Sequence, residues 1–279
     1  MTTEVLLLAF MVVAFVGLVV FAKFPVSLSL VLTAVALPLL SGRGFPLDQL
    51  VEGMFGYLDT GLVLITAMIF LKVIEGNGLL GELTRSITIR FGTSPLLLLV
   101  ALTIVVMFPG MITGSCTASV LGTGTLVSPI LLAMGMPLPV VGAVISSAAV
   151  YGMIAPPVNI PIMIIGGGID LPYIGFDGIL ALIAFPLAIL TTIFLGYRHV
   201  DRAALARVIE AKKAEPKAAN LLVYLPLLVA VVLMVGPKVF PKWFPDPRMP
   251  LTFAISALVG LLVGKRFDVV KVTREGVSE

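Results

Sequence analysis

Charged residues are scarce in this sequence. Asp, Glu, Lys and Arg make up 12% of the 279 residues, whereas 59% are hydrophobic and the mean hydropathy is +1.16. A soluble globular protein of this length needs far more polar surface, so the composition excludes that class and places the chain in a lipid bilayer. The pI near 9.1 does not indicate nucleic-acid binding, because the basic residues cluster at the ends of apolar segments, a pattern typical of membrane topology.

Several kinds of reactive residue pattern are also missing. The single cysteine, Cys116, excludes an intrachain disulfide and fits no metal-binding motif. The sequence contains no phosphate-binding loop, nucleophile triad or metal-ligand cluster, so we do not expect an enzyme. No Asp, Glu, Lys, Arg or His occurs between Phe91 and Ile169. A proton relay through titrating side chains is therefore poorly supplied in that stretch.

Long apolar segments recur along the whole chain. The first is as long and uncharged as the others and precedes no small-residue cleavage site, so we expect a span there and not a signal peptide. With the N-terminus outside, fourteen Lys and Arg residues fall on the inner side and four on the outer side, which favours N-out, C-in. Spanning helices are predicted at about residues 4–22, 25–41, 60–76, 138–166, 177–196, 219–236 and 249–264.

Two connections outside these spans have their own character. Glu75–Ser94 alternates apolar and charged residues at helical spacing, which predicts a helix lying along the membrane surface. Arg198–Ala219 is polar and is expected to be a solvated helix and linker with no role beyond joining two halves.

The region 92–136 is apolar but rich in Gly, Ser and Thr, as in "MFPGMITGSCTASVLGTGTLVSP" from Met107 to Pro129. Its first apolar arm, Pro95 to Phe108, would make about 21 Å of helix, which is short of the roughly 30 Å bilayer core. The "PG" that follows is expected to break the helix, so two short arms predict a re-entrant helical hairpin. Its polar tip must be buried in protein or line a wet cavity. The alternative is that the small residues serve only helix packing, as the spacing of Ala118 and Gly122 allows.

A second interruption is expected at Pro156 and Pro157, because proline inside a helix removes hydrogen bonds and clashes with the preceding turn. Asn159 is placed to cap a second half-helix with Pro161 in its first turn. A simple proline kink is the alternative. Secondary transporters bind ions and substrates at such discontinuous helices. The inward C-terminal helix ends favour a cation, to which Ser115, Thr117 and Ser119 add hydroxyl ligands, so Na⁺ is the expected coupling ion.

These segments resemble a known family. "GSCTAS", "GTGTLVSPILLAMGMP", "YGMIAPPVNIPIMIIGGG" and "LPYIGF" are similar to the large membrane subunit of tripartite ATP-independent periplasmic (TRAP) transporters, within the superfamily of elevator-type ion transporters. The likeness is strongest over residues 1–197. It implies a Na⁺ site made by the hairpin tip and the opened helix, with the ligands Gly114, Ser115, Thr117, Gly152, Ala155 and Pro157.

The resemblance also implies substrate contacts at Ser115, Cys116, Thr117 and Asn159. Cys116 stands where the family usually has a small hydroxyl residue, and Asn159 stands where serine is common. Both departures leave the identity of the substrate open.

A trace of inverted repeats is visible, as the family implies. "KFPVSLSL" (Lys23–Leu30) aligns with "RMPLTFAI" (Arg248–Ile255) as basic, any residue, proline, aliphatic, hydroxyl and apolar. We therefore expect a complete first repeat and an incomplete second one, with a companion membrane subunit supplying the rest; a truncated chain is the alternative. The expected regions are 1–91 (scaffold-like spans and surface helix), 92–136 (hairpin), 137–197 (broken helix and following span), 198–218 (cytoplasmic linker) and 219–279 (first two spans of the second repeat).

The sequence thus predicts an all-α integral membrane protein of the inner membrane that forms half of an elevator-type secondary transporter. Its expected function is Na⁺-coupled transport of a small organic anion, a carboxylate. A small membrane subunit and a periplasmic substrate-binding protein are the further expected partners, besides the lipid bilayer. The alternatives are a cation/proton antiporter of the same superfamily and a non-transporting membrane assembly subunit.

Overall fold

Helices make up the regular structure of the chain. The computed structural model describes residues 2–169, 171, 175–214, 221–240 and 247–264, and no strand occurs among these residues. The prediction of an all-α protein is confirmed over this part of the chain. The chain divides into two compact units, residues 1–58 and 59–279, and each is described by itself. The end of the linker at 215–220 and the C-terminus at 265–279, to which a cytoplasmic location was assigned, lie outside the described residues.

The first unit contains three helices, α1 (Thr2–Val20), α2 (Val26–Leu40) and α3 (Leu47–Gly56). The buried hydroxyls of α2 bond within their own helix: Ser29 Oγ donates to the Pro25 carbonyl (3.1 Å) and Thr33 Oγ1 to the Ser29 carbonyl (2.8 Å). These bonds satisfy the polar groups of an otherwise apolar helix. Many leucines and valines of α1 and α2 are exposed, which is the surface that a lipid-facing helix presents.

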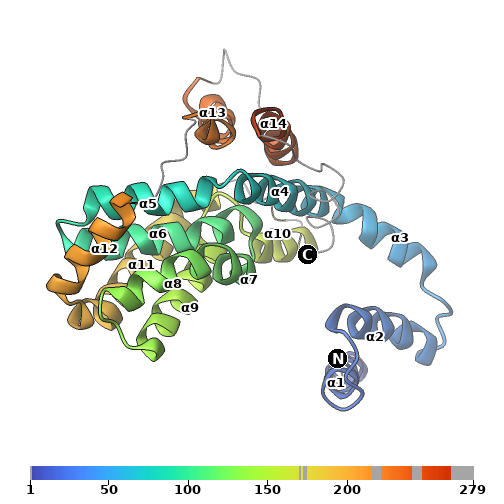
Figure 1. The fold of residues 1–279 in the computed structure, drawn as a ribbon. Coiled ribbons are helices and arrows are strands. Elements are labelled where there is room, and N and C mark those ends of the chain that lie inside the picture. Colours follow the sequence, from blue (N-terminus) through green and yellow to red (C-terminus); the bar gives the residue numbers. More distant parts are fainter. Residues whose placement is uncertain (1, 170, 172–174, 215–220, 241–246, 265–279) are drawn as a thin grey trace. The chain divides into compact units, whose positions relative to one another are not determined.

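The second unit holds the remaining elements (Figure 1). Among the described helices, three are long and apolar enough to cross a membrane by length and composition: residues 95–113, 116–133 and 176–199. Several shorter apolar helices accompany them. The elements are α4 (Leu58–Gly76), α5 (Leu79–Phe91), α6 (Pro95–Thr113), α7 (Cys116–Ser119), the π-helical turn η1 (Val120–Gly124), α8 (Thr125–Ala133), α9 (Leu138–Ile154), α10 (Ile160–Gly168), α11 (Phe176–Gly196), the 3₁₀ turn η2 (Tyr197–His199), α12 (Arg202–Ala214), the 3₁₀ turn η3 (Leu221–Tyr224), α13 (Leu225–Val239) and α14 (Arg248–Val263).

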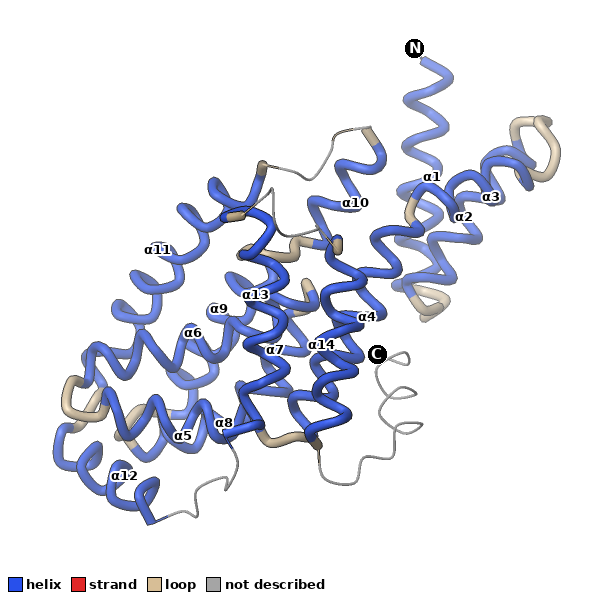
Figure 2. Tube along the Cα trace, turned by 90° about the horizontal axis from the view of Figure 1, so that it is seen from above, coloured by secondary structure: helices blue, strands red, loops and turns tan. Residues whose placement is uncertain are grey.

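Two hydrophobic cores hold this unit together. The larger core joins α6, α8, α9, α11 and α12 around residues such as Leu102, Met107 and Ala148. The second joins α4 to α13 and α14, which run beside one another in Figure 2. In that core the Phe70 and Phe253 rings lie 5.7 Å apart, and Asn77 Nδ2 donates to the Gly260 carbonyl (3.1 Å).

The hairpin's first arm differs from the sequence prediction. Its helix does not end at Phe108 but continues through Pro109 to Thr113, giving α6 19 residues and about 28 Å of length. The second arm supplies the reason. The Gly110 N–H donates to Ser119 Oγ (2.7 Å), and the Thr123 hydroxyl lies 3.3 Å from the Val106 carbonyl. These contacts give hydrogen-bond partners to backbone groups next to Pro109, which would otherwise weaken the helix.

At 19 residues, α6 is long enough to cross a membrane, so the length of the first arm no longer indicates a re-entrant hairpin. The second arm, α7, η1 and α8, forms 18 continuous residues from Cys116 to Ala133. The re-entrant course of the hairpin therefore stays a prediction that rests on its polar tip.

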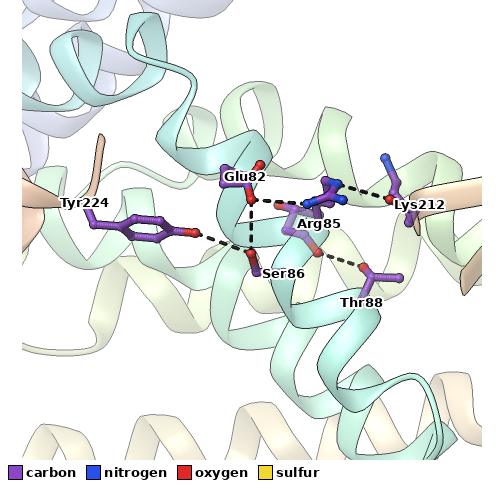
Figure 3. Close-up of polar contacts among 7 residues, drawn as sticks. Glu82, Arg85, Ser86, Thr88, Lys212 and Tyr224 are labelled. Carbon is purple, nitrogen blue, oxygen red and sulfur yellow. Dashed lines mark hydrogen bonds and ion pairs between the residues drawn. The ribbon is translucent and has the colours of Figure 1, made fainter. Parts of the chain in front are cut away.

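The polar connection after α11 is also more than a solvated linker. Helix α12 buries Leu205 and Val208 in the larger core. Figure 3 shows its link to α5, where Arg85 Nε donates to the Lys212 carbonyl (3.1 Å). Arg85, only 7% exposed, also pairs with Glu82 (3.3 Å). The expected helix is therefore present, but it is not wholly solvated, because apolar side chains on one of its faces pack into the core.

Candidate functional site

The hairpin tip is a tight reversal between α6 and α7. Gly114 has a φ of 64°, a left-handed conformation that favours glycine, and its N–H donates to the Gly110 carbonyl (2.7 Å). Ser115 caps the next helix, with Oγ accepting from the Ala118 N–H (3.3 Å). A Cβ at Gly114 would lie 2.5 Å from Ile160 Cγ1, so the tip abuts the start of α10.

The interruption at Pro156 and Pro157 is present. Helix α9 ends at Ile154 and α10 begins at Ile160. Asn159 Oδ1 accepts from the Ile162 N–H (3.0 Å), so the predicted cap is confirmed. The same side chain donates from Nδ2 to the Ile154 carbonyl (2.9 Å). One buried amide therefore bonds both half-helices across the break.

The last turns of α6 and α9 meet backbone to backbone. A Cβ at Gly152 would lie 2.5 Å from the Met107 carbonyl oxygen, and one at Gly110 would lie 2.9 Å from the Met153 nitrogen. The Val158 N–H donates to the Met111 carbonyl (3.2 Å). Glycine at both positions permits this approach, and it brings the C-terminal ends of α6 and α9 together.

A cavity of about 620 Å³ opens beside the tip. One wall comes from α4, the α4–α5 turn and α5, and the other comes from α7, η1 and α8. Most of the lining is apolar or small, but Lys72 and Glu75 form an ion pair in it, with Nζ and Oε2 3.4 Å apart. The lining residues are Met68, Leu71, Lys72, Glu75, Gly78, Leu80, Gly81, Ser115, Thr117, Ala118, Leu121, Gly122 and Leu126.

The predicted substrate residues divide into two groups. Ser115 and Thr117 line the cavity, and Thr117 is exposed. Cys116 is half-buried and Asn159 is 2% exposed, and neither is among the lining residues. The structure engages the Asn159 amide in closing the helix break.

The predicted Na⁺ residues lie in one neighbourhood. Gly114 contacts α10, and Gly152 and Ala155 are buried at the end of α9 beside α6. Pro157 is half-buried within the break. Their contributions as ion ligands, with those of Ser115 and Thr117, stay predictions.

Lys72 and Glu75 were not predicted from the sequence as site residues. A signal was present, because opposite charges three residues apart near the end of an apolar helix are costly in a membrane and usually functional. What the sequence could not show is that the fold brings this pair to the hairpin.

Comparison with known families decides the class of protein. The family model described as tripartite ATP-independent periplasmic transporter, DctM component, matches residues 9–272. The chain belongs to this family. The resemblance seen in the sequence is thereby confirmed, and the DctM chain is a subunit of a TRAP-type secondary transporter, not an enzyme. As one component of a tripartite system it implies companion subunits, and its family and apolar helices make it a multi-pass inner-membrane protein. No curated protein and no solved structure matches the chain significantly.

Proposed function

We propose that this DctM chain couples the import of a small organic anion, a carboxylate, to Na⁺. The observation that carries the proposal is the joining of the hairpin tip to the helix break, beside a cavity into which Ser115 and Thr117 open. Converging helix C-termini carry partial negative charge, and hydroxyl and carbonyl oxygens are the hard ligands that such cations prefer.

The donor chemistry fits Na⁺. In the part of the chain that the structure describes, no group of three or more His, Cys, Asp or Glu could hold a metal ion. A cation at the tip would therefore be held by neutral oxygens from Gly114, Ser115, Thr117, Gly152, Ala155 and Pro157. Such a set suits an alkali cation better than a transition metal.

An elevator movement is the mechanism we propose for transport. Support comes from the backbone contacts of α6 with α9 and from the hydrogen bonds of Asn159 to α9 and α10. Elements joined in this way are suited to move as one body and carry a bound ion with them. We further propose that a companion membrane subunit and a periplasmic substrate-binding protein complete the assembly.

The test is uptake of a labelled organic acid into liposomes containing the assembled transporter, measured against Na⁺ concentration. Ser115→Ala removes one proposed ligand and should raise the half-saturating Na⁺ concentration about tenfold, because an unmet polar partner costs about 1–3 kcal/mol. Ser147→Ala is the matched control, since that hydroxyl bonds only to the Val144 carbonyl within α9 among the contacts described.

An unchanged Na⁺ dependence in Ser115→Ala would contradict the proposed ion site. Uptake that follows a pH gradient and ignores Na⁺ would contradict Na⁺ coupling.

A further inference from the structure

A second cavity, of about 540 Å³, opens where the turn between α5 and α6 meets α12. Residues 92–96 line it on the side of α6, and Tyr197 and the first turns of α12 complete the lining. A Cβ at Gly92 would lie 2.5 Å from Ile209 Cδ1, so α12 packs directly on this turn. None of the lining residues belongs to the cavity beside the hairpin, so the two cavities are separate sites.

This cavity lies where two apolar helices end. Helix α6 begins at Pro95 and the apolar segment 176–199 ends just after Tyr197, and both are long and apolar enough to cross a membrane. Pro95 and Tyr197 line the cavity. Exposed apolar side chains follow directly, Leu96 in α6 and Phe194 in α11. Because lipid-facing surface begins beside the cavity, its opening lies at the level of the lipid headgroups.

The polar lining consists of one cation and three hydroxyl groups. Arg202 is the only charged residue among the lining residues, and Thr93, Ser94 and Tyr197 carry the hydroxyls. Within the part of the chain that the structure describes, no hydrogen bond or ion pair engages these four side chains. Guanidinium and hydroxyl groups are suitable donors for phosphate oxygens. Four donors are thus available to an anion that has several oxygens.

We propose that this cavity binds the phosphate of an anionic glycerophospholipid. Arg202 pairs with the phosphodiester, the hydroxyls donate to the headgroup, and the acyl chains lie against the apolar surface that includes Leu96 and Phe194. Basic pockets between membrane spans recognise anionic headgroups in this way. A soluble phosphate would gain nothing from the apolar surface, so the lipid is the favoured source. The inference goes beyond the proposed transport and needs only that the chain lies in a membrane.

The lining also favours an anionic headgroup over a zwitterionic one. Phosphatidylcholine brings an ammonium group besides its phosphate, and the lining residues include no Asp or Glu to receive it. Asp201 precedes Arg202, but its Oδ1 accepts from the Ala203 N–H (2.9 Å), and its Cβ lies beside Gly135 in the α8–α9 turn. Phosphatidylglycerol instead adds two hydroxyls, which suit the polar lining.

The test uses the full chain, purified with its companion subunits, and native mass spectrometry, which counts bound lipids and gives their dissociation constants. The probes are dioleoyl phosphatidylglycerol and dioleoyl phosphatidylcholine, which share their acyl chains. Phosphatidylglycerol should bind the wild type more tightly. Arg202→Met should weaken one phosphatidylglycerol site by about fivefold or more, the effect expected of one positive charge near the membrane surface. Arg202→Lys should retain most of the binding, because the charge remains.

Arg207→Met is the matched control, because Arg207 is an exposed arginine of the same helix and is not among the lining residues. It removes the same charge and therefore measures the general attraction of an anionic lipid to a basic surface. Ala206→Phe fills the cavity without changing the charge and should also weaken phosphatidylglycerol binding. Equal losses in Arg202→Met and Arg207→Met, or equal binding of the two lipids to the wild type, would overturn the proposal.

Competition separates a lipid from a soluble phosphate. Glycerol 1-phosphate carries the phosphate without the acyl chains. When it is added at the same concentration as phosphatidylglycerol, the lipid should remain the main bound species. Predominant binding of glycerol 1-phosphate that is lost in Arg202→Met would assign the cavity to a soluble ligand and overturn the lipid proposal.

Discussion

Ser119 holds the first arm of the hairpin together from the second arm. It is fully buried, and its Oγ accepts from the Gly110 N–H at 2.7 Å, directly after Pro109. Thr123, also fully buried, approaches the Val106 carbonyl from one turn further along. These small hydroxyl residues therefore stabilise α6 itself in addition to allowing close packing.

Ser119→Ala should destabilise the protein. The Gly110 N–H would lose this partner in a buried setting, at a cost of about 1–3 kcal/mol. Thermal unfolding in detergent measures the loss as a lower Tm. Ser147→Ala, whose hydroxyl bonds only within its own helix, should shift the Tm much less. Equal melting temperatures for the two variants would contradict the role assigned to Ser119.

Gly152→Ala should be more disruptive than its single methyl suggests. The new Cβ would lie 2.5 Å from the Met107 carbonyl oxygen, which is backbone and cannot rotate away, so α6 and α9 must separate. Overpacking of this kind costs about 1–3 kcal/mol.

Gly142→Ala on the same helix is the control. A Cβ there meets nothing within 4 Å, and alanine gains up to about 1 kcal/mol of helix propensity. Tm values should therefore move in opposite directions for the two variants. A tolerated Gly152→Ala would mean that the backbone contact is not tight.

At the scale of elements, α5 serves as the link between α12 and the start of α13. Arg85 reaches the Lys212 carbonyl near the end of α12, and Ser86 Oγ lies 3.4 Å from the Tyr224 hydroxyl in η3 (Figure 3). The end of α12 and the turn η3 are thus each bonded to α5.

Arg85→Met should loosen α12 without unfolding the hairpin. Hydrogen bonds to a charged group are worth about 1.5–3 kcal/mol, so amide exchange in α12 should accelerate by roughly tenfold to a hundredfold. Hydrogen–deuterium exchange with mass spectrometry resolves this by peptide. Arg90→Met, an exposed arginine in the last turn of the same helix, is the control. Unchanged protection of α12 in Arg85→Met would remove the proposed link.

Local chemistry explains which elements could be predicted. The break at Pro156 and Pro157 and the cap at Asn159 depend on residues within a few positions, so the sequence indicated both. Continuation of α6 through Pro109 could not be read locally, because Ser119 and Thr123 supply its partners from the other arm. Lys72 and Glu75 joined the candidate site only when the fold brought α4 to a hairpin some forty residues further along.

At the scale of the whole molecule, the charge distribution predicts that α12 lies on the cytoplasmic side. In a Cys116→Ala background, a cysteine introduced at Ala211, an exposed position of α12, should resist an impermeant thiol reagent applied to intact cells. A cysteine at Ser41, exposed after α2 and predicted to be outside, should react readily. Labelling at residue 211 from outside would refute the N-out orientation.

The single amide that spans the helix break has a mechanical consequence. Asn159 bonds the last residue of α9 and the first turn of α10 at once, so bending at this joint must break at least one of its two hydrogen bonds. We therefore expect the joint to be rigid, so that a rotation of one half-helix turns the other half-helix with it. We expect this unit to bend instead at Gly78, which lies between α4 and α5. This glycine has a positive φ, and the space where a side chain would begin is open.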